Sequence, residues 1–546
     1  MIKKYLTEIF ESALKKINAP IEIKIAFENS KNPEHGDYAF TGAMNLAKAM
    51  QKAPRKIAEE ILAVIEYDSQ YIEKLEIAGP GFINIKLAKS VFAQNLETIL
   101  EDADNFGRSD KYIGKKVNVE YVSVNPTGLL HLGHGRNACI GDTVANLYSW
   151  LGADVTREYY FNNAGNQMNN LAKSIYARYM QKYINTDYTF PEDGYHGLYI
   201  IEIADELFKE EADKLKKGNE EDLLRCRKFG EKWCFEKITK TLERLHIKQD
   251  YFYNEDTLYS DGKIDNLIKE LEKMDLVYES EGAKWLKLSQ LGLESDRVIV
   301  KSTGEATYRL PDIAYHKEKF ERGFDEIVDV FGADHIATVP DVIATLKALD
   351  YDTERINVLI HQFVTLTENG QQVKMSKRTG KSYTLDDLLD EVGEDVVRFF
   401  LLMRQISTHL EFDLDVARQQ SDKNPVFYLQ YAHARCWSVI EKSEIDINTI
   451  LKSDLTVLVA DEEINMIKTL IRFPDIVLLA CEKREPQIVA EYLRDAAAAF
   501  HIFYHECRVL GQEESIMKAR ILLTFAVKTV LKNGLAILGI KAPNKM

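Results

Sequence analysis

The feature that most constrains the fold is a strand-like run that leads, through a short break, into a glycine-containing helix. Residues 117–125, VNVEYVSVN, alternate apolar and polar side chains as a strand does, and the Pro-Thr-Gly at residues 126–128 ends the alternation. Residues 131–152 then show helical spacing of apolar side chains. Because a strand followed directly by a helix is the repeating unit of parallel sheets, this stretch predicts an α/β fold.

Further strand candidates, separated by helical stretches, follow along the chain. They cover residues 154–161, 296–301, 326–332 and 356–366. Strands spaced in this way predict a parallel, doubly wound sheet of the Rossmann type. The stretch 169–247 is helical and rich in Glu and Lys, and we interpret it as a helical insertion between the two halves of the sheet.

Two smaller units are expected to flank this sheet. Residues 1–108 combine amphipathic segments, a strand-like run at residues 21–27 and two strands joined by Gly-Pro-Gly at residues 79–81, which predicts a small α/β domain. From residue 385 the pattern is nearly all helical, and a Lys-Asn-Gly stop is expected to end the last helix at Gly534. The predicted units are an N-terminal α/β domain, the sheet domain, a helical connector and a C-terminal all-α helical bundle, at residues 1–108, 109–384, 385–424 and 425–546.

Composition and charge narrow the class of protein. The 546 residues are 45% hydrophobic and 29% charged, which is enough for several buried cores. The six cysteines form no C-x-x-C pair and the charged N-terminus does not look like a signal sequence, so we expect a cytoplasmic protein. No apolar run reaches the length of about 20 residues that a membrane-spanning helix needs. The net charge of −16 disfavours nucleic acid, but residues 425–546 hold 15 Lys and Arg against 15 Asp and Glu, so a nucleic-acid partner stays open.

The helix after the first strand of the sheet opens with two histidines. A helix N-terminus at the carboxyl end of a strand presents unpaired N–H groups and a positive dipole end, which favour phosphate. Residues three apart share one helix face, so His131 and His134 can both donate to one polyphosphate, while Gly133 and Gly135 let a base or ribose approach the backbone. The alternative is that both side chains only cap the helix, because four-residue patterns also arise by chance.

A basic loop strengthens the phosphate interpretation. It carries four cations within eight residues, Lys374, Lys377, Arg378 and Lys381. Gly370 precedes these residues and Gly380 lies near their end. Cations on a hinged loop can close over the β- and γ-phosphates and stabilise charge during displacement at the α-phosphate. The alternative, a solvated basic loop, is weak when the loop is taken together with the two histidines.

The histidine and lysine stretches also carry a family resemblance. HLGH at residues 131–134 with KMSK at residues 374–377 resembles the paired signature of the class I aminoacyl-tRNA synthetases. Nearly the whole chain is similar to the arginyl-tRNA synthetases in particular, in stretches such as NPTGLLHLGHGRN, TREYYFNNAGNQ, DIAYHKEKFERGFD, NPVFYLQYAHAR and FHIFYHECRVL. The resemblance implies a ligase that makes arginyl-adenylate from L-arginine and ATP, transfers the arginyl group to the 3′ end of tRNA(Arg), and depends on tRNA for the activation step. We also expect Mg²⁺ with ATP, no DNA partner and a monomer.

The resemblance assigns roles to residues of an arginine pocket. Asp312 and Glu255 would hold the cationic groups of arginine, because a planar, permanently charged guanidinium is best matched by carboxylates. Tyr308 would pack on the arginine side chain, Asn125 would fix its carbonyl or amine, and His335 would lie near the substrate. Which carboxylate meets the α-amine stays open.

On the nucleotide side, the resemblance implies a larger set of residues. The catalytic side chains would be His131, His134, Lys374 and Lys377. ATP would contact these residues and also Gly133, Gly135, Gly332, Asp334 and Ser376. His361 either borders adenine or lies in the core, and Pro311 stands where the family commonly has a charged or polar residue, which puts the presentation of Asp312 in doubt. No Cys or His spacing is typical of a zinc site, so we expect no protein-bound metal.

Two other classes of function stay open from the sequence. A small-molecule adenylyltransferase would share the histidine helix, but it needs no long C-terminal helical domain. A tRNA-binding relative without catalysis would be expected to lose a signature histidine or lysine, and none is lost here. Near the start of the terminal bundle several aromatic residues are candidates to stack on unpaired tRNA bases, although about half of them fit a core, Phe427, Tyr428, Tyr431 and Trp437.

Overall fold

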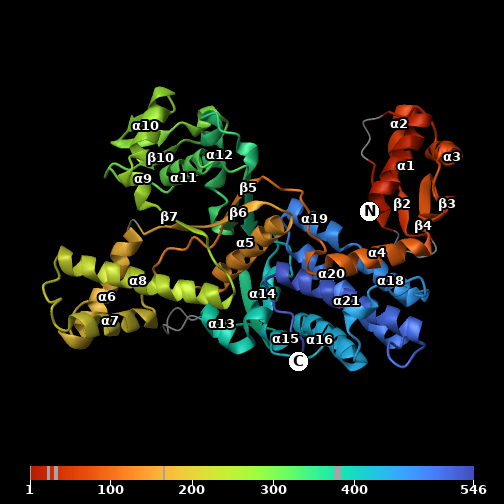
Figure 1. Cartoon of the computed structure of the whole chain (residues 1–546). Helices are drawn as coiled ribbons and strands as arrows, with labels where there is room; N and C mark the ends of the chain where they lie inside the picture. Colours follow the sequence, from red (N-terminus) through yellow and green to blue (C-terminus); the bar gives the residue numbers. More distant parts are fainter. Residues whose placement is uncertain (1, 21–24, 30–34, 164–165, 374–382) are drawn as a thin grey trace.

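A five-stranded parallel sheet lies at the centre of the molecule (Figure 1). The structure is a computed structural model that describes residues 2–20, 25–29, 35–163, 166–373 and 383–546. The strand order is β12-β11-β5-β6-β7 and every neighbouring pair is parallel, with the bounds β5 Lys116–Glu120, β6 Asp154–Phe161, β7 Tyr251–Asn254, β11 Glu326–Gly332 and β12 Ile356–His361. The chain goes from β5 to β6 and β7 on one side and returns to β11 and β12 on the other. The doubly wound α/β prediction is therefore confirmed, and the topological switch point lies between β5 and β11.

Helix α5, Leu132–Trp150, carries the two histidines from the carboxyl end of β5. Its side chains are buried almost all round, because it packs against β6 and β11 and also against α14, Glu394–Leu402, and α19, Phe473–Lys483. A helix enclosed in this way has little freedom to move. Its N-terminus is therefore fixed at the crevice outside the carboxyl ends of the strands.

The predicted helical insertion is a bundle with its own apolar core, at the end of the molecule farthest from the N-terminal unit (Figure 1). It consists of α6 Asn166–Tyr183, α7 Leu198–Glu211 and α8 Glu220–Arg244. The structure differs from the expectation in one respect. The bundle joins β6 to β7, which are neighbours on the same side of the switch point, so it does not separate the two halves of the sheet.

A second insertion, which the sequence pattern did not reveal, follows β7. It contains α9 Asp256–Ser260, α10 Lys263–Lys273 and an antiparallel sheet in the order β10-β9-β8, with the bounds β8 Val277–Ser280, β9 Ala283–Leu286 and β10 Arg297–Val300. The strand expected at residues 296–301 is thus real but does not belong to the parallel sheet. Only Ile299 of β10 is fully buried, whereas strands of a parallel sheet are covered on both faces. Helix α11, Arg309–Glu321, leads back to β11 of the central sheet, and α12, Val339–Ala348, connects β11 to β12.

The N-terminal unit is a small α/β domain, as predicted. Its antiparallel sheet has the order β1-β2-β4-β3 and is covered by helices, with the bounds α1 Ile2–Lys16, β1 Phe27–Asn29, β2 Tyr38–Phe40, α2 Gly42–Met50, α3 Pro54–Val64, β3 Ile72–Ala78 and β4 Phe82–Leu87. The hairpin expected around residues 79–81 joins β3 to β4. Of the strand expected at residues 21–27, residues 21–24 lie outside the described residues, and β1 begins at Phe27. Helix α4, Lys89–Asp102, connects this unit to β5.

The stretch expected as a helical connector also contains a strand. Helices α13 Leu385–Val392, α14 and α15 Leu414–Ala417 lie in residues 385–424, together with β15 Leu410–Asp413. Strand β15 pairs in parallel with β13, Val364–Glu368, which in turn pairs with β14, Gln371–Gln372. The connector is therefore attached by hydrogen bonds to the segment that follows β12.

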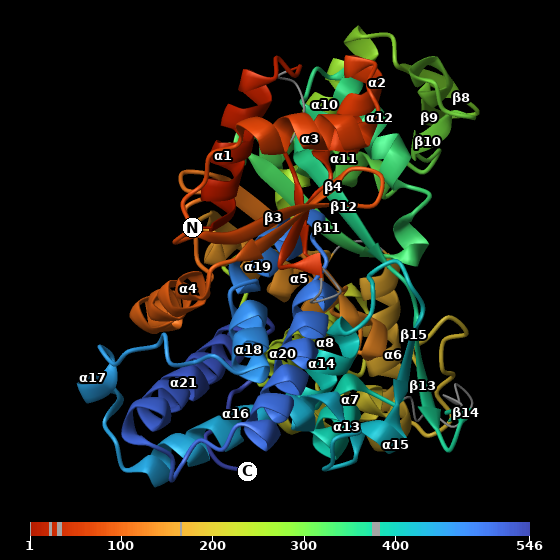
Figure 2. The same cartoon turned by 90° about the vertical axis from the view of Figure 1, so that its right-hand side faces the viewer.

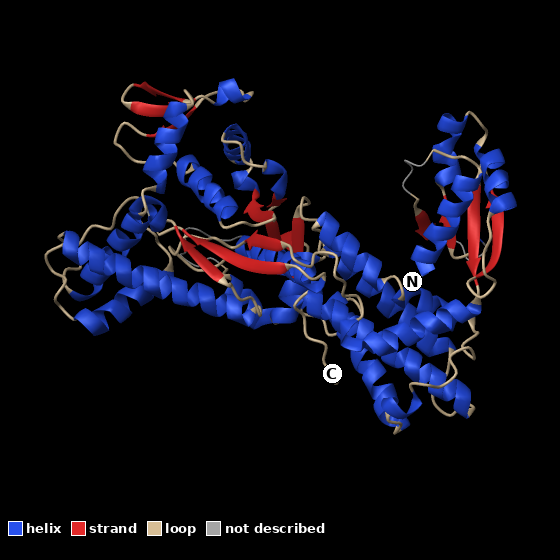
Figure 3. Cartoon of the chain, turned by 45° about the horizontal axis from the view of Figure 1, so that its top comes forward, coloured by secondary structure: helices blue, strands red, loops and turns tan. Residues whose placement is uncertain are grey.

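The C-terminal unit is a helical bundle, as predicted (Figure 3). Its helices are α16 Pro425–Ser443, α17 Ile447–Ile450, α18 Asp461–Leu470, α19, α20 Gln487–Glu506 and α21 Glu514–Ile537. The expected stop at Gly534 is wrong, since α21 continues to Ile537. A Cβ at Gly534 would lie 2.5 Å from Cδ2 of Leu493 on α20, and Asn533 donates to the carbonyls of Ala103 and Phe106. Both residues therefore lie within α21 and contact neighbouring segments, Gly534 by giving room to Leu493 and Asn533 by its two hydrogen bonds. Among the described residues, no helix is both long and apolar enough to span a membrane.

Candidate active site

The N-terminus of α5 holds His131 and His134 as a stacked pair. His131 is the N-cap, and its Nδ1 accepts hydrogen bonds from the backbone N–H groups of Gly133 at 3.1 Å and His134 at 3.3 Å. In return, Nδ1 of His134 accepts from the N–H of His131 at 3.3 Å, and the ring centroids are 3.5 Å apart. Both rings thus cap the helix through Nδ1. In a neutral ring with Nδ1 as acceptor, the proton is on Nε2, so each Nε2 is a hydrogen-bond donor.

Burial keeps both rings uncharged. It lowers the pKa of His131, and it lowers the pKa of His134 to about 3, with a further contribution from the neighbouring histidines. At neutral pH the helix N-terminus therefore presents two neutral N–H donors in addition to its positive dipole end. The capping role and the phosphate-binding role predicted from the sequence do not exclude one another.

The carboxyl ends of β11 and β12 border the same crevice. Gly332 ends β11 opposite His361 of β12, and a Cβ at Gly332 would lie 2.5 Å from Oδ1 of Asp334. The pKa of His361 is lowered to about 4, chiefly by burial and also by the charge of Arg136, while the charge of Asp334 opposes the shift. His361 is thus buried beside the histidine pair, and the missing side chain at Gly332 leaves room for the Asp334 carboxylate.

Two carboxylates, Glu255 and Asp312, form the other side of the site. Glu255 directly follows β7, and its Oε2 accepts a hydrogen bond from the Tyr160 hydroxyl at 3.0 Å. Asp312 lies in the first turn of α11. The pKa of each carboxyl is raised to about 7, chiefly by burial; for Asp312 the charges of Glu120 and Glu255 also raise the pKa, and the charges of His316 and Lys319 lower it. Glu255 and Asp312, which were both predicted for the arginine pocket, are therefore two nearby carboxylates that lack a full counter-charge.

Beneath them lies a buried cluster whose charges are matched. Lys319 Nζ is 2.6 Å from Oε2 of Glu120 and 2.6 Å from Oδ1 of Asp329, and His316 Nε2 is 3.0 Å from Oδ2 of Asp329. Burial opposes ionisation, but Lys319 outweighs it and lowers the pKa of Asp329, while Asp329 raises the pKa of Lys319 and His316. The ring of His316 also bonds the backbone oxygen of Asp312 at 2.7 Å. The cluster thus fixes the helix turn that presents Asp312.

Another buried carboxylate, Glu158 of β6, is also fully paired. Its oxygens accept from Arg322 at 2.7 and 2.8 Å, from Asn118 at 2.9 Å and from the Tyr315 hydroxyl at 2.5 Å. Bidentate pairing with a guanidinium is the geometry that carboxylates favour. In the described part of the chain, neither Glu255 nor Asp312 forms an ion pair with Lys or Arg, which distinguishes them from Glu158, although the charges of His316 and Lys319 reach Asp312.

The other three residues predicted for arginine differ in their contacts and exposure. Asn125 donates from Nδ2 to Oε1 of Gln167 at 2.6 Å, at the start of α6. Tyr308 is the N-cap of α11, one turn before Asp312, and is 64% exposed. The ring of His335 stacks on Phe331 with centroids 5.2 Å apart and is directed toward the nucleotide-side residue Asp334 at 3.7 Å.

The predicted reason for Gly135 is not what the structure shows. Gly135 is buried, and a Cβ there would lie 2.9 Å from Cδ1 of Leu385 and 3.3 Å from Cδ1 of Leu401. Its small size therefore lets α5 pack against α13 and α14. A Cβ at Gly133 would instead lie 3.0 Å from the ring of His131, so this glycine leaves room for the stacked histidine.

The cations of the predicted basic loop lie outside the described residues, and so does Ser376: Lys374, Lys377, Arg378 and Lys381. Beyond them, Leu385 donates its N–H to the backbone oxygen of Leu130, just before the histidine helix. The first residue of α13 is thus hydrogen-bonded to the segment that leads into α5.

Sequence reasoning did not identify Glu120 and Lys319 as site residues. Glu120 is one of the polar residues that alternate with valines in β5, so its sequence position does not mark it as a site residue, and only the structure shows that it is 3% exposed. A buried carboxylate needs a partner, and its partner lies 199 positions away in the sequence. That distance is why no local pattern could reveal the pair.

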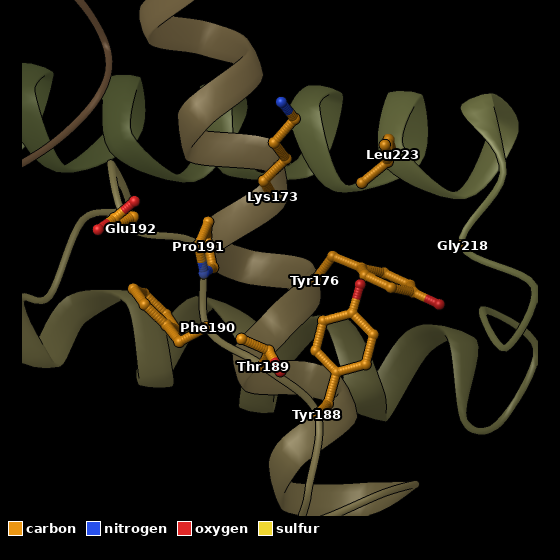
Figure 4. A pocket seen from close by; sticks show the side chains of 9 residues that line it. All are labelled: Lys173, Tyr176, Tyr188, Thr189, Phe190, Pro191, Glu192, Gly218 and Leu223. Atoms are coloured by element: carbon orange, nitrogen blue, oxygen red, sulfur yellow. The ribbon is translucent and has the colours of Figure 1, made fainter.

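One pocket lies away from these residues (Figure 4). It has a volume of about 540 Å³ and lies in the helical insertion, where Tyr176, Tyr188, Phe190 and Lys173 form part of its wall. None of the predicted site residues that the structure describes lines it. Over the described part of the chain, no group of three or more His, Cys, Asp or Glu side chains is arranged to hold a metal ion.

Three protein-family models together match almost the entire chain. The model "Arginyl tRNA synthetase N terminal domain" matches residues 4–87, "tRNA synthetases class I (R), catalytic domain" matches residues 95–403, and "DALR anticodon binding domain" matches residues 429–546. The second match covers the central sheet, both insertions and every described residue predicted for the site.

Individual proteins agree with the family assignment. The arginine–tRNA ligase of Salinibacter ruber is 47% identical, over 97% of this chain and 97% of its own. That of Desulfotalea psychrophila is 45% identical, over 96% of this chain and 95% of its own. The solved Thermus thermophilus arginyl-tRNA synthetase shares the fold, with a TM-score of 0.79 over 100% of both chains at 22% identity. The chain belongs to the arginyl-tRNA synthetase family of class I tRNA synthetases.

Proposed function

We propose that this chain joins L-arginine to the 3′ end of tRNA(Arg) in two steps. The arginine carboxylate attacks the α-phosphorus of ATP, the bond to diphosphate breaks, and arginyl-adenylate forms. A hydroxyl of the terminal tRNA ribose then attacks the arginyl carbonyl and AMP leaves. The observation that carries the proposal is the pair Glu255 and Asp312, two nearby carboxylates without a full counter-charge, beside a helix end built to receive phosphate.

On the arginine side, the two carboxylates are suited to a ligand with two cationic groups. Arginine brings a guanidinium and an α-ammonium. Their positive charges would stabilise the ionised forms of Glu255 and Asp312, which burial disfavours. Tyr308 is exposed at the edge of the site, where it can pack on the arginine side chain, and Asn125 and His335 would contact its polar end. A guanidinium can meet a carboxylate with two parallel hydrogen bonds, which a lysine ammonium cannot do, so the pocket would favour arginine.

On the nucleotide side, His131 and His134 would donate their Nε2 protons to phosphate oxygens. Both rings are neutral donors, so they can stabilise the charge that develops on the leaving diphosphate through hydrogen bonds, without transferring a proton. Gly332 and Asp334 would line the nucleotide, with His361 behind them. We assign Lys374, Ser376 and Lys377 to the polyphosphate on the sequence pattern alone.

Mg²⁺ fits this arrangement as a companion of ATP. The cation commonly takes one or two protein carboxylates and completes its ligands with phosphate oxygens and water. Asp334 has an exposed carboxylate beside the nucleotide-side histidines and is suited to that role. When bound, Mg²⁺ would neutralise charge on the polyphosphate.

The two flanking units would bind tRNA, and activation of arginine would require it. In the C-terminal unit, Tyr431 is 40% exposed and stacks on Phe427 with centroids 6.3 Å apart, while Tyr428 and Trp437 are partly buried. An exposed stacked ring of this kind suits an unpaired base. We further propose that residues 1–108 contact the tRNA, and we retain a monomer and a cytoplasmic location as predictions.

The substitution Asp312→Asn tests the arginine pocket. Asparagine keeps the shape but removes a charge-assisted contact, so kcat/KM for arginine in tRNA charging should fall at least about tenfold, while the KM for ATP stays nearly constant. A matched control is Asp256→Asn, which neutralises an exposed carboxylate next to Glu255. Arginine kinetics unchanged by Asp312→Asn would remove Asp312 from the pocket.

A further inference from the structure

We infer that an ion pair between Arg309 and Asp341 acts as a clamp that sets the arginine side of the pocket relative to the nucleotide side. Nε of Arg309 is 2.6 Å from Oδ2 of Asp341. Arg309 opens α11, the helix that presents Asp312, and Asp341 lies in the first turn of α12. The inference rests on the proposed function, since it concerns how the same pocket is positioned.

On the α12 side the first turn of α11 is held by this ion pair, whereas on the sheet side the bond between His316 and the backbone oxygen of Asp312 holds the same turn. Its N-cap, Tyr308, makes no side-chain capping hydrogen bond in the described structure and is largely exposed. Pro311 lacks an N–H group, so this position offers no backbone donor. The buried side chain of Leu310 fixes the turn toward the core, and Arg309 is the polar anchor that fixes its rotation.

Asp341 is placed so that it requires this partner. Its side chain is 8% exposed, and a buried carboxylate is stable only when it is paired. The second cation near it, Arg297 of β10, lies farther away, with Nε at 3.9 Å. Arg309 is therefore the principal counter-charge, and it cannot move away without leaving a buried charge poorly compensated.

One of the two helices joined by this pair carries a site residue, and the other follows a segment that carries one. Asp312 follows Arg309 by three residues on α11, and the short helix Ala333–His335, which carries Asp334, immediately precedes α12. The ion pair therefore fixes the separation between the carboxylate for arginine and the residues for ATP. Catalysis by positioning is sensitive to this separation, because the arginine carboxylate must meet the α-phosphorus. Arg309 and Asp341 are positioning residues that act through Asp312 and Asp334.

The test is a double-mutant cycle with Arg309→Gln and Asp341→Asn, read as kcat and KM in tRNA charging. Each single variant should raise the KM for arginine about tenfold, with a smaller effect on kcat, because the pocket is displaced while its chemical groups remain. The double variant should be no worse than the worse single variant, because both remove the same contact. If Arg309→Gln does not fold, Arg309→Lys, which keeps the charge without the planar fork, provides the same comparison.

The control is Lys317→Gln, which removes an ion pair between Lys317 and Glu270 farther along the same helix. It should leave the KM for arginine near the wild-type value. An unchanged KM in both single variants, additive effects in the double variant, or an equal effect of Lys317→Gln would overturn the clamp. Wild-type protein that does not charge tRNA with arginine would instead overturn the proposed function, and the clamp with it.

Discussion

The side chain of His131 can fill two roles, helix capping and phosphate binding, that the sequence left as alternatives. Its Nδ1 caps α5 and thereby leaves the proton on Nε2, so capping fixes the tautomer that phosphate binding needs. The spacing of the two histidines predicted their shared face. It could not predict their charge, because the neutral state results from burial against segments distant in the sequence.

The raised pKa values of Glu255 and Asp312 predict a pH-dependent affinity for arginine. Both carboxyls have a pKa of about 7, so below that pH they are largely protonated and a cationic ligand must displace a proton. The KM for arginine should therefore fall as the pH rises from about 6 to about 8. Steady-state charging kinetics across this range measure the effect.

Two controls separate this effect from a general loss of activity. The KM for ATP should change little over the same range, because the pKa values of His134 and His361 are about 3 and about 4. In Asp312→Asn the pH dependence of the KM for arginine should be shallower, since one ionisation is gone. A KM for arginine that is constant between these pH values would contradict the assignment of the two carboxyls.

Elements whose identity depends on local pattern were predictable, and elements whose identity depends on a distant partner were not. Strands β6 and β11 occupy the predicted residues. Strand β10 was also expected, but its membership in a separate antiparallel sheet depends on pairing with β9, which no periodicity within β10 encodes. The Lys-Asn-Gly of α21 resembles a helix stop, yet it lies inside the helix because α20 and the segment after α4 pack there.

The docking of α21 predicts a contrast between two adjacent residues. Asn533 is 2% exposed and bonds the carbonyls of Ala103 and Phe106, so Asn533→Ala should destabilise the chain by about 1–3 kcal/mol. Lys532 pairs with Asp104 at the surface, and Lys532→Ala should cost less than about 1 kcal/mol. Urea denaturation should give a lower midpoint for Asn533→Ala only. Equal midpoints for the two variants would show that α21 does not depend on this contact.

Across the whole molecule, contacts between distant parts of the chain connect the units proposed to hold tRNA with one another and with the unit proposed to hold arginine and ATP. Arg398 of α14 pairs with Asp142 of α5 at 2.6 Å and donates to the backbone oxygens of Leu245 and Leu538. The N-terminal unit lies against the C-terminal bundle (Figure 2), where Lys3 pairs with Asp475. The units were predictable from the sequence. Their junctions were not, since each joins residues from distant parts of the chain.

ATP–diphosphate exchange with each of the twenty amino acids, measured with and without tRNA, tests the arginine specificity and the need for tRNA together. We predict exchange with arginine alone and only when tRNA is present, because the carboxylate pocket selects the amino acid and the family resemblance implies tRNA-dependent activation. Strong exchange with arginine and ATP in the absence of tRNA would contradict that dependence. Exchange with a different amino acid would contradict the pocket formed by Glu255 and Asp312.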